Sequence, residues 1–134
     1  MLPARLAPER FAAAIACRLD CVVPQGLAVR ANGIAVAVFD PTWWGDSLIA
    51  GVVAEEDGRS IVERVETAAL AIMSAAQDAV TESTKQQWPI GPSGVGMPEA
   101  RVVGGELRMW FGDKDVPVLR LESLNLLDLA DGAA

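Results

Sequence analysis

Apolar residues recur at helical spacing close to the start of the chain. The stripe that they form consists of Phe11, Ile15, Leu19 and Val22. Pro8 suits the first turn of a helix, because proline has no N–H to leave unpaired there. The pattern therefore predicts an amphipathic helix from Pro8 to Asp20. Arg18 falls inside the apolar stripe, so its side chain must extend past the edge of the stripe or pair with a carboxylate.

The longest apolar stripe lies between Ser60 and Lys85. Its members are Val62, Val65, Ala69, Ile72, Met73, Ala76 and Val80. Ser60 and Glu63 have the spacing of a capping box, which marks the start of a helix. A helix of roughly 25 residues would be about 37 Å long, so we expect this segment to be the principal helix of the core.

Alternating residues on both sides of Asn32-Gly33 predict a β-hairpin, because this dipeptide tolerates the positive φ angles of a two-residue turn. Such a turn would pair Ala31 with Ile34. One face of the hairpin would carry Leu27, Val29, Ile34, Val36 and Val38. The opposite face would carry Ala28, Arg30, Ala35, Ala37 and Phe39. The second face is almost free of polar groups, and it needs a cover that the first helix, a second sheet or a second copy of the protein could supply.

A second hairpin is predicted around Gly104-Gly105, with Arg101 to Val103 before the turn and Glu106 to Phe111 after it. Leu107, Met109 and Phe111 share one face of the later strand, and Glu106, Arg108 and Trp110 share the other. Val118 to Glu122 is predicted to be a further strand.

Three segments have less specific patterns. Leu48 to Ala54 is a short apolar run that we interpret as a strand, although a loop fits the same residues. Ile90 to Pro98 is rich in Gly and Pro and is predicted to be a loop. Ser123 to Ala130 fits a short helix capped by Ser123 or the end of a strand.

These elements predict an α+β fold in the order α-β-β-β-α-β-β-β. The strands would form one antiparallel meander sheet of five or six strands, with the long helix packed across one face. A chain of 134 residues is of the size of one domain, so we treat residues 1–134 as a single domain.

Composition and charge bear on the partners of the protein. The chain has 11 basic and 18 acidic residues and a net charge of −7. The basic residues are scattered along the sequence, whereas binding to nucleic acid or to an anionic membrane needs a cluster of them. The charge-free part of the long helix is too short to cross a bilayer, and no signal peptide is recognisable. We therefore expect a cytoplasmic protein without a nucleic-acid or membrane partner.

The residue types exclude much enzyme chemistry. The chain has no His and no Tyr, which removes His-dependent triads and His-ligated zinc. Cys17 and Cys21 are expected to be reduced and partly buried, since side chains four residues apart on a helix converge poorly for a disulfide. Turn chemistry and helix N-terminal charge explain the acidic runs Glu55 to Asp57 and Asp113 to Asp115. We assign no catalytic residue, no metal site and no cofactor.

The four tryptophans are the candidate binding residues. Trp43 and Trp44 are adjacent in a segment, Thr42 to Asp46, that is predicted to be a turn. Trp88 lies in a loop, and Trp110 lies on the outward face of its strand. Exposed aromatic side chains are enriched at binding surfaces, but these four could instead fill the ends of a small core.

Three stretches resemble a group of small acidic bacterial proteins of unknown function: Pro8 to Asp20, Gly58 to Pro89 and Val118 to Leu129. The order of elements is also similar to that of class-I type III secretion chaperones, and longin and roadblock-type domains have nearly the same order. The resemblance to the chaperones implies a dimer that holds segments of partner proteins. It implies no enzymatic activity.

The function that we expect is non-catalytic protein interaction, as a dimeric adaptor or chaperone-like domain. The alternative is a small-molecule-binding protein or an enzyme that works through carboxylates. Distant Asp and Glu residues that converge in a deep pocket would favour the alternative.

Overall fold

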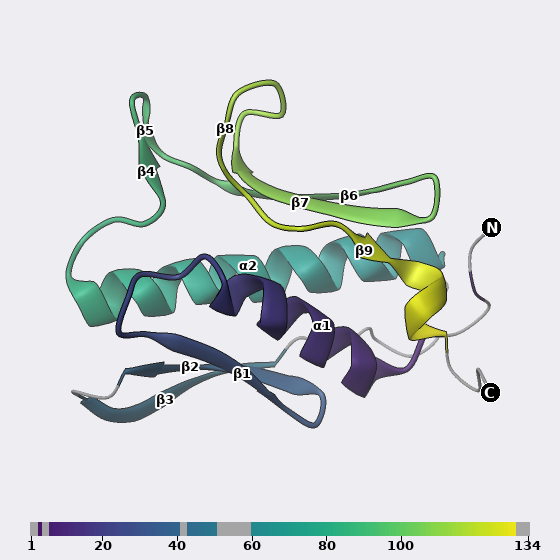
Figure 1. The fold of residues 1–134 in the computed structure, drawn as a ribbon, viewed down its shortest axis with the longest axis horizontal. Helices are drawn as coiled ribbons and strands as arrows, with labels where there is room; N and C mark the ends of the chain where they lie inside the picture. The colour runs from purple at the N-terminus through teal and green to yellow at the C-terminus, as the bar shows by residue number, and fades with distance from the viewer. Residues whose placement is uncertain (1–2, 4–5, 41–42, 51–59, 131–134) are drawn as a thin grey trace.

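Two antiparallel sheets enclose two helices in the computed structural model of the protein, which describes residues 3, 6–40 and 60–130 and the backbone of residues 43–50. The first sheet contains β1 (Ala28–Asn32), β2 (Ala35–Asp40) and β3 (Trp43–Ala50) in that order. The second sheet contains β6 (Pro98–Val103), β7 (Glu106–Gly112), β8 (Pro117–Arg120) and the short β9 (Leu124–Asn125), which pairs with β7. Helices α1 (Pro8–Asp20) and α2 (Ile61–Thr84) lie between the two sheets (Figure 1). The remaining elements are the hairpin of β4 (Ile90–Gly91) and β5 (Gly94–Val95), and the 3-10 helix η1 (Leu126–Leu129).

The α+β class and the antiparallel pairing are confirmed, but the prediction of one continuous sheet is wrong. Within the described residues, no strand of the first sheet pairs with a strand of the second. The physical reason lies in α2, whose buried residues reach from Ala68 to Gln77 around the helix, an arc of about 180° at 3.6 residues per turn. This arc is wide enough for α2 to pack against β2 and β3 on one side and against β6 and β7 on the other.

Both helices have the bounds that the sequence predicts. Pro8 occupies the first turn of α1, as expected. The Oγ atom of Ser60 accepts a hydrogen bond from the Glu63 N–H at 3.2 Å, so Ser60 caps α2. Lys85 ends α2 in the left-handed conformation, with φ of 59°. None of the helices in the described part of the chain is long and apolar enough to cross a membrane.

The predicted hairpin at Asn32-Gly33 is present with a different register. Asn32 pairs with Ala35 and Val29 pairs with Val38, so the turn residues are Gly33 and Ile34. Gly33 takes the positive φ, 62°, that this turn requires. Each strand partner is displaced by two residues from the predicted pairing, and a shift of two keeps every side chain on its predicted face. Val29, Val36 and Val38 are accordingly buried against the helices.

All three of the less specific segments contain strands. The backbone from Trp43 to Asp46, predicted to be a turn, belongs to β3, as does the Leu48 to Ala50 part of the predicted third strand. Residues 51–54 lie outside the described residues. Ser123 to Ala130 contains both predicted alternatives, β9 and then η1, but Asn125 caps the 3-10 helix in place of Ser123.

The segment from Ile90 to Pro98 is more ordered than the predicted loop. Its β4–β5 hairpin is tied to α2, because Gln77 Nε2 donates a hydrogen bond to the Gly96 carbonyl at 2.6 Å. A Cβ atom at position 96 would lie 3.1 Å from the Gly112 N atom and from the Val118 Cβ atom. A side chain at position 96 would therefore have to push β7 or β8 away by a few tenths of an ångström.

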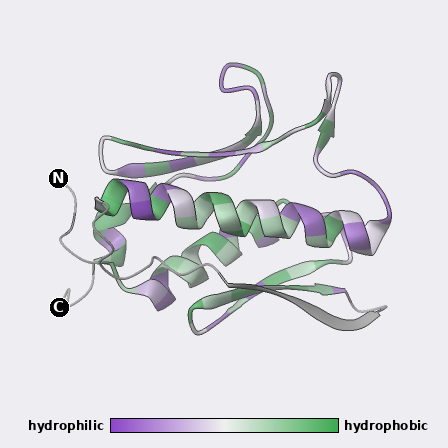
Figure 2. Cartoon of the chain, turned by 180° about the vertical axis from the view of Figure 1, so that it is seen from behind, coloured by the Kyte–Doolittle hydropathy of each residue, from purple (hydrophilic) through white to green (hydrophobic). Residues whose placement is uncertain are grey.

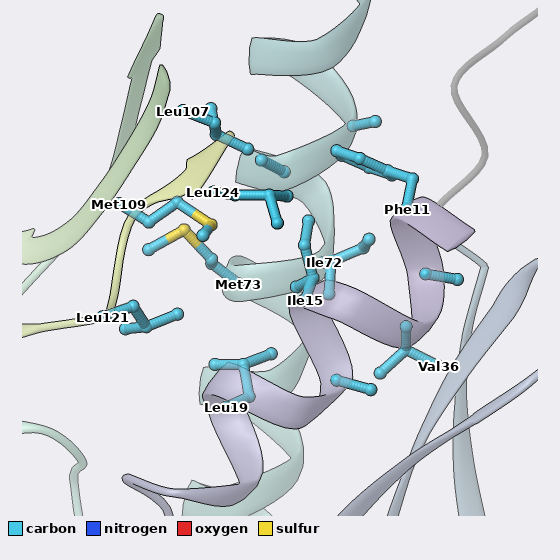
Figure 3. Packing of buried hydrophobic residues seen from close by; sticks show 14 of the residues in the cluster. Phe11, Ile15, Leu19, Val36, Ile72, Met73, Leu107, Met109, Leu121 and Leu124 are labelled. Carbon is cyan, nitrogen blue, oxygen red and sulfur yellow. The ribbon is translucent and has the colours of Figure 1, made fainter. Parts of the chain in front are cut away.

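The hydrophobic core lies between the helices and the inner faces of both sheets (Figure 3). Its largest fully buried side chains include Phe11, Ile15 and Leu19 of α1, Ile72 and Met73 of α2, Val36 of β2, and Leu107, Met109 and Phe111 of β7. Their alternation on β7 confirms the predicted inward face of this strand. Glu106, Arg108 and Trp110 therefore lie on the outer face of the second sheet.

Candidate functional site

The outer face of the second sheet gathers basic side chains around a tryptophan. Arg101 of β6 lies directly opposite Arg108 of β7, and Trp110 of β7 lies directly opposite Arg120 of β8. Directly paired residues place their side chains on the same face of a sheet, so Arg120 of β8 and Glu99 of β6 flank Trp110, and the Arg101–Arg108 pair lies two residues further along the same face. The strands of this sheet carry both hydrophilic and hydrophobic positions, as their alternation requires (Figure 2).

A hollow of about 820 Å³ lies in this face. Arg101, Arg108, Trp110 and Arg120 line it together with Lys114 from the turn between β7 and β8. We call this set of five residues the basic hollow. Glu106 is the one carboxylate among the residues that line it, and no cysteine lines it.

The basic residues of the hollow are short of counter-charges. Among the described residues, the ion pair in the hollow joins Arg108 Nη2 to Glu106 Oε1, at 3.8 Å and with both side chains about half exposed. No described carboxylate lies within ion-pair distance of Arg101, Lys114 or Arg120. Like charges directly opposite each other destabilise a pair of strands, so a bound anion near Arg101 and Arg108 would offset their repulsion.

Trp110 contributes a free hydrogen-bond donor. Its indole Nε1 atom is buried and has no hydrogen-bond partner within the described part of the chain. Buried donors are almost always paired in folded proteins, by protein groups or by ordered water, so this N–H is an exception within the described residues.

The structure separates the four tryptophans that the sequence singled out. Trp110 lines the hollow, whereas Trp88 is half-buried and its ring packs against Phe111, with the ring centroids 5.3 Å apart. Trp43 and Trp44 have their backbone at the start of β3, and their side chains lie outside the described part of the structure.

Trp110 was predictable from the sequence as a candidate binding residue, whereas the basic residues near it were not. The basic residues look scattered along the chain, but strand pairing brings four of them to one hollow. Part of the signal was present in the predicted hairpin, because a two-residue turn at Gly104-Gly105 necessarily places Arg101 opposite Arg108. The contributions of Lys114 and Arg120 depend on the return of β8 beside β7, which no local pattern specifies.

The remaining candidate chemistry is absent from the described residues. Cys17 and Cys21 are free, and both are exposed, so the expected partial burial is wrong. The buried residues of α1 lie on one face of the helix. Cys17 lies on the opposite face, away from the core. No group of three possible metal ligands occurs among the described residues. The Asp113 carboxylate accepts a hydrogen bond from the Asp115 N–H at 2.8 Å, which is the expected turn chemistry.

The alanine-rich face of the first hairpin points away from both helices. Since α1 and α2 pack on the valine face of this sheet and the second sheet lies beyond them, neither supplies the cover that the sequence analysis required (Figure 1). Ala37 is nevertheless buried, and Phe39 is 37% exposed. The homodimer stays a prediction.

No protein-family model, no curated protein and no solved structure matches this chain. The basic hollow is therefore identified as the candidate site by its own residues and geometry.

Proposed function

We propose that this chain is a non-catalytic interaction domain that binds an acidic segment of a partner protein in the basic hollow. One observation carries the proposal: four of the 11 basic residues of a protein with net charge −7 meet around one tryptophan. Arginine forms paired, charge-assisted hydrogen bonds with carboxylates, and arginine and tryptophan are enriched among the residues that dominate binding energy. The acidic remainder of the surface repels an acidic partner, so the hollow is the place where such a partner is attracted.

The chemistry of the hollow favours binding over catalysis. A mechanism that divides the acid and base roles between two carboxylates has no basis in the lining of the hollow, which contains Glu106 alone. Ser123 also lines the hollow, but a serine nucleophile needs a base within hydrogen-bond reach, and no hydrogen bond within the described residues joins the Ser123 hydroxyl to Glu106 or Lys114. The order of elements from α1 to α2 agrees with the resemblance to class-I type III secretion chaperones, which hold segments of other proteins.

The edge of the second sheet is a poorer place for a partner than its face. Glu66 Oε2 accepts a hydrogen bond from the Val102 N–H of β6 at 2.7 Å, so this N–H is directed away from β7 and is already paired. By strand alternation Pro98, at the start of β6, has the same orientation and has no N–H at all. An incoming strand would therefore find few free donors along β6, and such protection is how proteins discourage strand addition.

The proposal is tested by titrating the full chain with a short oligoglutamate peptide and following tryptophan fluorescence or heat. We expect binding that weakens as salt is raised, because screening reduces attraction between charges. The double variant Arg101→Gln/Arg108→Gln should lose at least about tenfold in affinity, a difference of about 1.4 kcal/mol. The matched control, Arg10→Gln/Lys85→Gln, removes the same charge from exposed positions outside the hollow and should bind like the native chain.

Three outcomes would overturn the proposal. The native chain does not bind the acidic peptide, the control loses as much affinity as the hollow variant, or a single-stranded oligonucleotide of equal charge binds more tightly than the peptide. In the last case the partner is a nucleic acid.

A further inference from the structure

We propose that the basic hollow recognises a phosphate monoester carried by the partner segment, so that the domain binds a phosphorylated protein. This inference rests on the proposed function and names the group that the hollow selects. It starts from the positions of three guanidinium groups on one sheet face. Arg101 and Arg108 are directly paired, which places their backbones about 5 Å apart, and Arg120 pairs with Trp110, two residues further along on the other side of β7.

The charge in the hollow exceeds what a carboxylate can neutralise. Four basic side chains line it, and Glu106, at 3.8 Å from Arg108, is the lining carboxylate. A side-chain carboxylate brings one negative charge and two oxygen atoms. A phosphate monoester brings about −1.5 to −2 charges at pH 7 and three strong acceptor oxygens.

The donors in the hollow match those oxygens in kind and number. Each guanidinium group presents a planar fork of N–H donors that suits phosphate oxygens. Lys114 adds a mobile point charge at the turn between β7 and β8. A dianion placed between Arg101 and Arg108 would also remove the repulsion between this directly opposed pair.

The size of the hollow favours a phosphate that is attached to a chain. A hollow of about 820 Å³ falls in the range of sites that hold drug-sized ligands, far larger than one phosphate group needs. The remaining space has Trp110 as its large aromatic side chain and Val103 at its rim, which suits the residues that flank a phosphorylated side chain.

The experiment compares three peptides that are identical except for one central residue: serine, glutamate or phosphoserine. Calorimetric titration of the native full chain should show the phosphoserine peptide binding at least tenfold more tightly than the glutamate peptide. Its advantage should shrink between pH 7.5 and pH 5, because the second phosphate pKa is about 6 and the group then loses one charge. This comparison needs no variant and so does not depend on how a variant folds.

The variant Arg101→Lys/Arg108→Lys separates charge from geometry. It keeps both positive charges but removes the planar forks, so it should lose the preference for phosphoserine while still binding the glutamate peptide. The control Arg10→Lys should keep the preference. Circular dichroism and thermal unfolding establish that each variant is folded before it is titrated.

The outcomes distinguish this inference from the proposed function. Equal affinity for the glutamate and phosphoserine peptides would overturn the phosphate preference and leave the acidic-segment proposal standing. Binding of neither peptide would overturn both. Inorganic phosphate, or vesicles that contain a phosphorylated lipid, binding as tightly as the phosphopeptide would show that the phosphate is not recognised on a protein chain.

Discussion

Arg18 and Gln77 are polar residues on buried helix faces, and each donates hydrogen bonds to carbonyl groups of another segment. Arg18 Nε and Nη2 lie 3.2 and 3.0 Å from the Ser123 carbonyl oxygen, while Gln77 holds the Gly96 carbonyl. Of the two alternatives expected from its place in the stripe, pairing with a carboxylate is wrong, because the partners of Arg18 among the described residues are backbone carbonyls. Buried carbonyls need such partners, so these two side chains position irregular segments that apolar packing alone would leave free.

Asp20 ties the end of α1 to β1 and has a shifted pKa. Its Oδ1 atom accepts a hydrogen bond from the Val29 N–H at 2.9 Å and lies 2.8 Å from Arg30 Nη1. The Val29 N–H lowers the pKa of the Asp20 carboxyl group below its ordinary value of 3.8, and the Arg30 guanidinium lowers it further, while burial opposes both. The ionised carboxylate is therefore bound more favourably in the folded chain than in the unfolded chain.

We predict that Asp20→Asn lowers stability at neutral pH by about 0.5 kcal/mol, since the pair is largely exposed to solvent. A lowered folded-state pKa gives stability that is present above the unfolded pKa and lost as pH falls through the folded pKa. The difference between the native chain and Asp20→Asn in free energy of unfolding should therefore be full at pH 7 and shrink below about pH 4. Urea unfolding at pH 7, 5 and 3 measures it, with Asp78→Asn as an exposed control. A difference that grows toward low pH would contradict the assignment.

At the scale of elements, the edge of β6 offers the sharpest prediction. Glu66→Ala should free the Val102 N–H and leave this edge open to a strand of another molecule. We expect a loss of about 1–2 kcal/mol in the free energy of unfolding, as for a hydrogen bond to a charged group, together with association that increases with protein concentration. Light scattering and urea unfolding measure the two effects. Glu82→Ala removes an exposed carboxylate from the same helix and should change neither the free energy of unfolding nor the association. If both variants associate to the same extent, the loss of negative charge, and not the freed Val102 N–H, causes the association.

The elements themselves were predictable from the sequence, because caps, turns and apolar periodicity act locally. Ser60 caps the start of α2, and Gly33 permits the turn between β1 and β2; both effects are independent of the tertiary structure. The division into two sheets was not predictable, because it depends on Ala68 and Ala79 being buried on a second side of α2, and alanine gives little hydrophobic signal. Only part of the basic hollow was predictable from the sequence, because some of its residues come together through local pairing and others do not. The β6–β7 hairpin that carries Trp110 is formed by residues close in the sequence. The pairing of β8 with β7 is not specified by any local sequence pattern.

At the scale of the molecule, α2 connects the site to the rest of the fold. Its buried residues pack on the second sheet through β6 and β7 and on the first sheet through β2 and β3. The basic hollow lies on the outer face of strands whose inner face is part of this shared core. The geometry of the hollow should therefore depend on packing in the distant first sheet.

This dependence predicts one cooperative unfolding transition for both sheets. Val36→Ala removes a fully buried side chain of the first sheet and should cost about 2 kcal/mol. Native-state hydrogen exchange should show the slowest amides of β7, on the second sheet, losing protection by the same free energy, because they open only when the shared core does. Ile34→Ala, at a position in the same hairpin that is 43% exposed, should leave those amides nearly unchanged. Unchanged protection of β7 in Val36→Ala would mean that the sheets unfold separately and that the hollow is built on an independent unit.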